Sequence, residues 1–256
     1  MTQGTSTTGI DDFRELRERN KYYIDKTMMI ADFINYDDKV SLITRPRRFG
    51  KTLNMTMLRD FFDLNKKSED IFSGLAIMET EYINQMNSRP VVFMSFKGCS
   101  GADLEKLKVS LAMVIKYEYF KYEEIMTNSK RVDWESNQYS EFYQIYKTFR
   151  NLVAAKDDDK KIADETLKRS LLVLTITLTN FYGQKPLVLI DEYDEPLINA
   201  HIKGFREEFS IYIYSDFLGN ALKSNTDLHQ AVLTGIQRVA KDNFFSKLNN
   251  FRVCMS

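Results

Sequence analysis

Two short segments carry side chains suited to chemistry on phosphate groups. The first, VSLITRPRRFGKT (Val40–Thr52), is an apolar run that turns basic and ends in Gly50-Lys51-Thr52. A strand followed by such a loop and a helix binds phosphates with backbone N–H groups, its lysine reaches the terminal phosphates, and its threonine hydroxyl ligates Mg²⁺. The strict phosphate-loop pattern has glycine where this chain has Arg45. The alternative is therefore a turn that happens to end in lysine before a helix and binds no phosphate.

The second segment is PLVLIDEYDE (Pro186–Glu195), an apolar run closed by paired carboxylates. A continuous apolar run suits a strand buried on both faces, and α/β sheets bind ligands at the carboxyl ends of their strands. With a phosphate loop upstream, we expect Asp191 to hold the Mg²⁺ shell and Glu192 to polarise the attacking water. An acidic loop after a core strand is the alternative. The two segments in this order favour nucleotide binding more than either does alone.

A third segment, VLTGIQR (Val232–Arg238), follows as the next strand and turn. Thr234 ends the strand expected beside the acidic one, where additional-strand ATPases place a group that senses the terminal phosphate or orients water. Gly235 allows a close backbone approach. Arg238 is placed to neutralise phosphate charge, as an arginine finger in cis or in trans. The alternative is a strand-to-turn junction with a surface arginine.

The elements that position these residues alternate between strands and helices. The predicted strands are Val40–Thr44, Pro90–Phe96, the four-residue apolar run within Pro186–Glu195, Leu228–Gly235 and Phe251–Met255. The predicted helices are Asp11–Arg19, Tyr22–Ile34, Thr52–Leu64, Ala102–Met126, Tyr139–Ala155, Thr166–Tyr182 and Phe205–Asn225, with a turn at Ile71–Leu75. This alternation predicts a parallel α/β sheet with right-handed crossovers. We expect a flexible tail at residues 1–10 and one domain at 11–256, with a helical insertion at about 102–168.

Composition excludes several classes of protein. The chain has 256 residues, of which 43% are hydrophobic, and its 36 basic residues balance 36 acidic ones. No global field therefore draws it to nucleic acid or to an acidic membrane. Cys99 and Cys254 suggest no disulfide framework, so we expect a soluble, cytoplasmic protein. The longest apolar stretch, Leu171–Thr179, is too short to span a bilayer, and the N-terminus lacks the apolar core of a signal peptide.

Four stretches together resemble a known family: FRELRERNKYYIDKT, TRPRRFGKT, LVLIDEYDEPL and LTGIQRVAKDNFFSKLNN. The chain is similar to the bacterial predicted AAA-ATPase-like family of additional-strand P-loop ATPases. The resemblance extends from about Phe13 to Phe251 and is weakest across the helical region 102–168. It implies a P-loop NTPase-type parallel sheet flanked by helices, with ATP and Mg²⁺ as cofactors.

The resemblance also implies roles for individual residues. The phosphate loop would comprise Arg45, Pro46, Arg47, Arg48, Phe49, Gly50, Lys51 and Thr52, since this family commonly lacks the first glycine. Asp191 and Glu192 would be the Walker B pair and Thr234 the sensor-like position, while Ile24 and Lys26 would contact the base or ribose. Members often continue into a nuclease domain of the PD-(D/E)XK type. We expect that domain, and a lid with a second sensor arginine, to be absent here.

Two functions follow from these expectations. One is Mg²⁺-dependent ATP hydrolysis, which the acidic pair Asp191-Glu192 favours. The other is a slow molecular switch, in which bound ATP controls homo-oligomerisation or a partner such as an effector nuclease, and the missing lid favours this alternative.

A nucleic-acid site is a competing interpretation of the basic loop. It would use Arg45, Arg47, Arg48 and Lys51 for the backbone and Tyr22 and Tyr23 for stacking. Four basic residues around one loop suit a triphosphate better than an extended strand. A metal site made by His201 and His229 is not expected because their spacing fits no ligand pattern.

Overall fold

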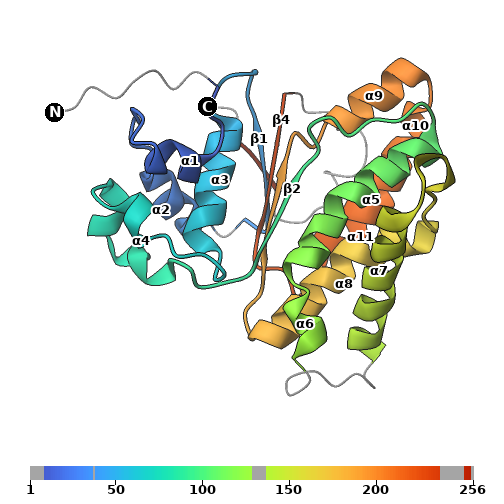
Figure 1. Ribbon diagram of the computed structural model, residues 1–256. Coiled ribbons are helices and arrows are strands. Elements are labelled where there is room, and N and C mark those ends of the chain that lie inside the picture. Colours follow the sequence, from blue (N-terminus) through green and yellow to red (C-terminus); the bar gives the residue numbers. More distant parts are fainter. Residues whose placement is uncertain (1–8, 37, 129–136, 237–250, 255–256) are drawn as a thin grey trace.

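Five parallel strands form a single sheet in the order β2-β3-β4-β1-β5 (Figure 1). A computed structural model of the chain describes residues 9–36, 38–128, 137–236 and 251–254. The strands are β1 (Val40–Thr44), β2 (Val91–Ser95), β3 (Leu187–Asp191), β4 (Ala231–Gly235) and β5 (Phe251–Cys254). The order places β4 between β1 and β3, which is the additional strand that the sequence predicts. The predicted α/β parallel architecture is therefore confirmed.

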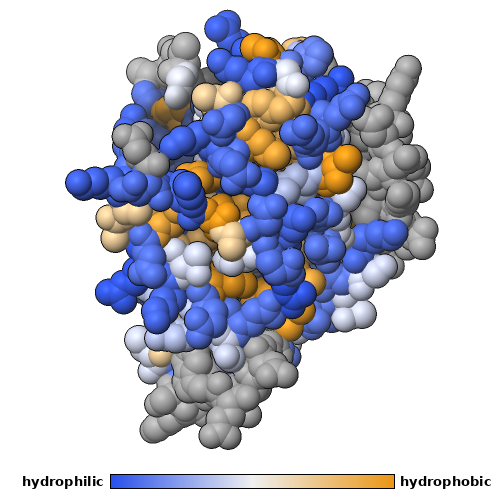
Figure 2. Space-filling view, turned by 90° about the vertical axis from the view of Figure 1, so that its right-hand side faces the viewer, coloured by the Kyte–Doolittle hydropathy of each residue, from blue (hydrophilic) through white to orange (hydrophobic). Residues whose placement is uncertain are grey.

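Helices cover both faces of the sheet (Figure 1). One layer contains α1 (Phe13–Glu18), α2 (Met28–Asn35), α3 (Lys51–Phe62), α4 (Glu69–Phe72) and the 3₁₀ helices η1 (Ala76–Glu79) and η2 (Glu81–Gln85). The other contains α5 (Leu104–Lys121), α6 (Glu124–Thr127), α7 (Asn137–Ala154), η3 (Asp157–Asp159), α8 (Asp164–Tyr182), α9 (Glu195–Lys203), α10 (Arg206–Ser210), the π-helical η4 (Ile211–Phe217) and α11 (Leu218–Leu222). On the outer face of this second layer, hydrophobic residues lie in patches among hydrophilic ones (Figure 2).

The sheet separates two hydrophobic cores. Successive side chains of a strand point to opposite faces, so neighbouring strand residues belong to different cores. Val91, Leu187, Leu189 and Val232 pack with the α3 layer, and Val92, Met94, Val188, Ile190 and Leu233 pack with the α5–α11 layer. All five residues of β3 are buried. The apolar run before the two acids is therefore continuous because its strand has no solvent-facing side.

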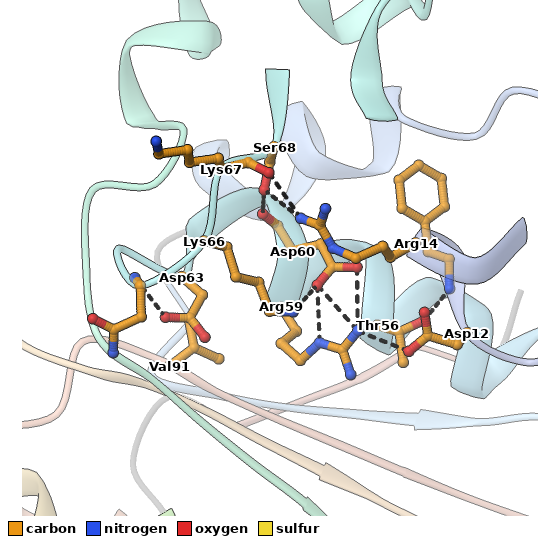
Figure 3. A network of polar contacts seen from close by, with 12 residues as sticks. Asp12, Arg14, Thr56, Arg59, Asp60, Asp63, Lys66, Lys67, Ser68 and Val91 are labelled. Carbon is orange, nitrogen blue, oxygen red and sulfur yellow. Dashed lines mark hydrogen bonds and ion pairs between the residues drawn. The ribbon is translucent and has the colours of Figure 1, made fainter. Parts of the chain in front are cut away.

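A polar network fixes the orientation of α3, the helix that begins at Lys51 (Figure 3). The buried Asp60 carboxylate accepts hydrogen bonds from Arg59 at 3.0 Å and forms an ion pair with Lys66 at 2.8 Å. Arg59 also reaches Asp12 at 2.8 Å, and Asp12 is the N-cap of α1. Charge-assisted bonds of this kind tie the last turn of α3 to the start of α1.

Strand β2 lies at an edge of the sheet. The backbone groups on its open side bond to side chains of α5 and of Tyr122, the residue that follows α5. The Tyr122 hydroxyl accepts the Val91 N–H at 3.0 Å and donates to the Val91 carbonyl at 2.9 Å. Lys121 donates to the same carbonyl at 2.7 Å. The Glu118 carboxylate accepts the N–H of Phe93. Buried backbone groups need such partners, and here side chains provide them where a further strand would otherwise pair.

Two of the helices predicted before β3 differ from the structure. The helix predicted at Tyr22–Ile34 begins only at Met28. The Asp25 carboxylate accepts the backbone N–H of Thr27 at 2.8 Å and its hydroxyl at 2.6 Å, which holds the preceding residues in a turn. The helix predicted at Ala102–Met126 is divided into α5 and α6 by a turn.

The chain after β3 is also more broken than predicted. The predicted helix Phe205–Asn225 consists of α10, η4 and α11, and α9 (Glu195–Lys203) was not predicted. The predicted turn Ile71–Leu75 overlaps α4. The insertion at about 102–168 coincides with α5, α6 and α7, but its status as a subdomain stays a prediction. No helix in the described part of the chain has the length and apolar character needed to cross a membrane.

Candidate functional site

The carboxyl ends of β1, β3 and β4 bring three predicted residues together. Thr52 Oγ1 donates a hydrogen bond to Asp191 Oδ2 at 2.7 Å, and Thr234 Oγ1 donates to Asp191 Oδ1. Asp191 and Thr234 are both 1% exposed. Strand register accounts for the meeting, since Ile190 pairs with Leu233 directly before the two polar residues. One buried carboxylate thus joins the first turn of α3 to the ends of two central strands.

The loop at residues 45–50 leaves the end of β1 and turns into α3. Its start is held by the Arg45 N–H, which donates to the Gly235 carbonyl at 3.1 Å. Arg48 and Gly50 have left-handed backbone conformations, with φ of 68° and 73°. Such conformations curl a chain so that successive N–H groups can bind an anion. The first N–H groups of α3 have no intrahelical acceptor, so this end of the helix also favours negative charge.

Positive charge is concentrated on this loop. Lys51 Nζ donates to the carbonyls of Arg45 at 2.8 Å and Pro46 at 3.0 Å, so the ammonium lies over the loop. Arg47 and Arg48 are exposed. Within the described ranges, neither arginine forms an ion pair with a carboxylate. The loop therefore presents cationic side chains that an anionic ligand can use.

Glu192 follows Asp191 in an unusual backbone conformation. Its φ of 53° lies in the left-handed region, which costs a non-glycine residue roughly 1–3 kcal/mol. Burial raises the pKa of its carboxyl group, as do the nearby charges of Asp191 and Glu195, whereas Lys97 and Lys51 oppose the rise. A carboxylate whose pKa is raised is a stronger proton acceptor, which suits a general base.

Lys97 is a site residue that the sequence did not indicate. It lies just beyond β2, and the preceding Phe96 N–H donates to the Asp191 carbonyl at 2.9 Å. Its ammonium approaches Asp11 Oδ2 at 3.4 Å and lowers the pKa of Glu192. Only the strand order reveals this neighbour, because β2 and β3 are far apart in the chain.

The oxygen donors at the site fit Mg²⁺. A threonine hydroxyl and a carboxylate are hard ligands, and Mg²⁺ is commonly held by one or two protein oxygens together with water and substrate phosphates. Thr52 Oγ1 and Asp191 Oδ2 are such a pair. Among the described residues, no group of three or more His, Cys, Asp or Glu side chains could form a metal site. A metal at Thr52 and Asp191 would therefore share its coordination with a ligand.

Three predicted site residues are not joined to this arrangement. Arg238 lies outside the described residues. Ile24 is 64% exposed and Lys26 is exposed, and no described contact connects either to the loop, so their role stays a prediction. Of the two tyrosines considered for base stacking, Tyr23 packs edge-on against Phe13 at 5.4 Å.

Comparisons with known proteins cover most of the chain. A family model described as predicted AAA-ATPase matches residues 7–245. An uncharacterised protein from the vnfD 5′ region of Azotobacter chroococcum mcd 1 is 25% identical over 260 residues, covering 98% of this chain and 40% of that relative. The chain thus spans less than half of the relative's length. No solved structure matches significantly. Because the family match includes the loop, the acidic strand and β4, the chain belongs to the predicted AAA-ATPase family.

Proposed function

We propose that this chain binds Mg²⁺–ATP and hydrolyses it. The observation that carries the proposal is the Asp191 carboxylate, which accepts hydrogen bonds from Thr52 and Thr234 at the carboxyl end of the sheet. A hydroxyl at the start of a loop-capped helix and a buried acid on a nearby strand are the groups that P-loop ATPases use for Mg²⁺. The lysine that precedes the hydroxyl lies over the same loop.

Each residue has a distinct task in this proposal. Lys51 and the backbone N–H groups of residues 47–52 hold the β- and γ-phosphates, and Thr52 and Asp191 hold Mg²⁺. The ion, when bound, neutralises phosphate charge and orients the terminal group. Glu192 accepts a proton at its carboxylate from the attacking water, and Thr234 fixes the orientation of Asp191.

Two further roles come from the sequence and remain part of the proposal. Arg238 would add positive charge beside the terminal phosphate as a finger in cis or in trans. Ile24 and Lys26 would contact the base or ribose.

Replacing Lys51 with alanine is expected to weaken Mg²⁺–ATP binding by roughly tenfold to a hundredfold, because a hydrogen bond to a charged group contributes about 1.5–3 kcal/mol. The fold should persist, since Lys51 contacts only loop carbonyls through Nζ. Calorimetric titration with Mg²⁺–ATP measures the change. Lys67→Ala is the matched control, because Lys67 is an exposed lysine beyond the far end of α3.

Unchanged affinity in Lys51→Ala would contradict the phosphate-loop assignment. Tight binding by the parental chain without measurable turnover would instead support the switch function. The titration and a phosphate-release assay on the same samples therefore separate the two activities.

Lys97→Met is expected to move the acid limb of the pH–rate profile to higher pH. Lys97 lowers the pKa of Glu192, so removing its charge should raise that pKa. The ionised base would then form only at higher pH, which slows turnover on the acidic side and leaves the plateau rate unchanged. Steady-state hydrolysis measured across the pH range tests this.

Lys203→Met is the control for this experiment, since Lys203 is exposed at the end of α9 and is not among the charges that influence Glu192. A shift of the acid limb to lower pH in Lys97→Met, or an equal shift in both variants, would contradict the role given to Lys97.

A further inference from the structure

Asp194 occupies a helix N-cap but does not cap its own helix. It precedes α9, and its side chain makes no capping hydrogen bond to the first turn of that helix. Its Oδ2 instead accepts the backbone N–H of Ile236, beyond the end of β4, at 2.9 Å. The residue is 2% exposed. Aspartate is among the residues preferred for capping a helix, yet the Asp194 carboxylate bonds to Ile236 instead. We take this as a sign that the contact between the ends of β3 and β4 matters more than the cap.

The same two strand ends meet at two further points. The Tyr193 N–H donates to the Thr234 carbonyl at 2.9 Å. A Cβ atom placed on Gly235 would lie 2.6 Å from Tyr193 Cε1 and 2.7 Å from Asp194 Oδ1, closer than carbon side chains approach. A side chain at this position would therefore have to displace Tyr193 or Asp194. Residues 234–236, at the end of β4 and directly beyond it, are in contact with residues 193–194 after β3.

These contacts surround the residues proposed for catalysis. Glu192 directly precedes the pair Tyr193-Asp194, and its left-handed backbone needs support from its surroundings. Thr234 directly precedes Gly235 and donates to Asp191. A movement of either turn would change the distance between the Glu192 carboxylate and Thr234. By contrast, Lys51 and the residues of the phosphate loop belong to a different turn of the chain.

We propose that Asp194 is a positioning residue for ATP hydrolysis. Its carboxylate joins the turn that carries Glu192 to the turn that follows Thr234, so that the base and the hydroxyl keep a fixed separation around Asp191. The inference rests on the proposed function for its effect on turnover. The contact between the two turns does not depend on that function.

The first measurement is the division between turnover and binding. Asp194→Ala should lower kcat by about tenfold to a hundredfold, since displacements of about 1 Å in a catalytic group have effects of that size. The dissociation constant of Mg²⁺–ATP should change much less than kcat, because Lys51 and the N–H groups proposed to hold the phosphates are on another loop. Asp194→Asn retains an oxygen that can accept the Ile236 N–H and should recover most of the lost turnover.

The matched control is Asp103→Ala. Asp103 is also an N-cap aspartate whose carboxylate accepts a backbone N–H, that of Lys106 at 2.8 Å, but within its own helix α5. This variant removes the same kind of hydrogen bond and should keep the parental kcat.

The second measurement requires no activity. Hydrogen–deuterium exchange should be faster in Asp194→Ala than in the parent at residues 191–195 and at 231–236 together, and Asp194→Asn should restore protection of both segments. If the parental chain has no hydrolytic activity, the proposed function fails. The exchange measurement still shows whether Asp194 joins the two segments.

Three results would overturn the inference. The first is parental turnover in Asp194→Ala, and the second is a loss of kcat matched by an equal loss of affinity. The third is exchange that increases in one of the two segments alone, which would mean that Asp194 does not join them.

Discussion

Replacing Glu192 with glutamine is expected to slow ATP hydrolysis by about a hundredfold or more while Mg²⁺–ATP remains bound, since general base catalysis contributes roughly 10²–10⁴ in rate. The amide keeps the size of the side chain but cannot accept a proton from water. Burial and the charges of Asp191 and Glu195 raise the pKa of the Glu192 carboxyl group, and this makes the ionised group a better base. Phosphate release at saturating Mg²⁺–ATP, paired with a calorimetric titration, measures both quantities.

Glu195→Gln is the control for this result. Glu195 lies in the first turn of α9 and contributes negative charge near Glu192, but the proposal gives it no contact with the reacting groups. Removing its charge should lower the pKa of Glu192 and move the acid limb of the rate profile to lower pH. Parental turnover in Glu192→Gln would exclude this carboxylate as the base.

Glu118→Gln is expected to stabilise the fold at pH above 7 by roughly 3 kcal/mol, from a pKa difference of about two and a half units between the folded and unfolded chain. Burial raises the pKa of Glu118 to about 7 from an ordinary 4.5, and Asp63 adds to the rise, while Lys121, the Phe93 N–H and Arg59 oppose it. Among the residues that the structure describes, none forms a hydrogen bond with Glu118 Oε2. A neutral amide avoids the cost of a buried charge.

The direction of the pH dependence follows from proton binding. Between pH 4.5 and about 7 the folded chain holds a proton at Glu118 that the unfolded chain has lost. Stability of the parental chain should therefore fall as pH rises through this window, and Glu118→Gln should remove that part of the fall. Chemical denaturation at a series of pH values measures it. Glu165→Gln, an exposed glutamate on α8, is the control, and equal pH dependence in parent and Glu118→Gln would contradict the prediction.

Much of the fold was predictable because charged residues in the sequence show where its strands begin or end. The apolar run Val40–Thr44 is bounded by charged and basic residues and forms β1 with the same limits. The run before Asp191 ends at its carboxylate and forms β3. Helix limits were less predictable, since the start of α2 depends on the contact between Asp25 and Thr27. Periodicity does not encode such local polar contacts.

The candidate site was only partly predictable for a similar reason. Motif spacing identified Thr52, Asp191 and Thr234, and the strand order explains why they meet. The influence of Lys97 on Glu192 depends on β2 lying beside β3, which no local pattern reveals. The contact of Asp194 with Ile236 was hidden because it depends on β3 and β4 ending side by side, which the residues around Asp194 do not encode.

The side chains that cover β2 have a consequence for encounters between molecules. An uncovered edge strand can accept a strand from another polypeptide, which is a common route to aggregation. Tyr122 and Lys121 already occupy the Val91 backbone groups that such a strand would use. Copies of the chain that associate are therefore not expected to join their sheets at β2.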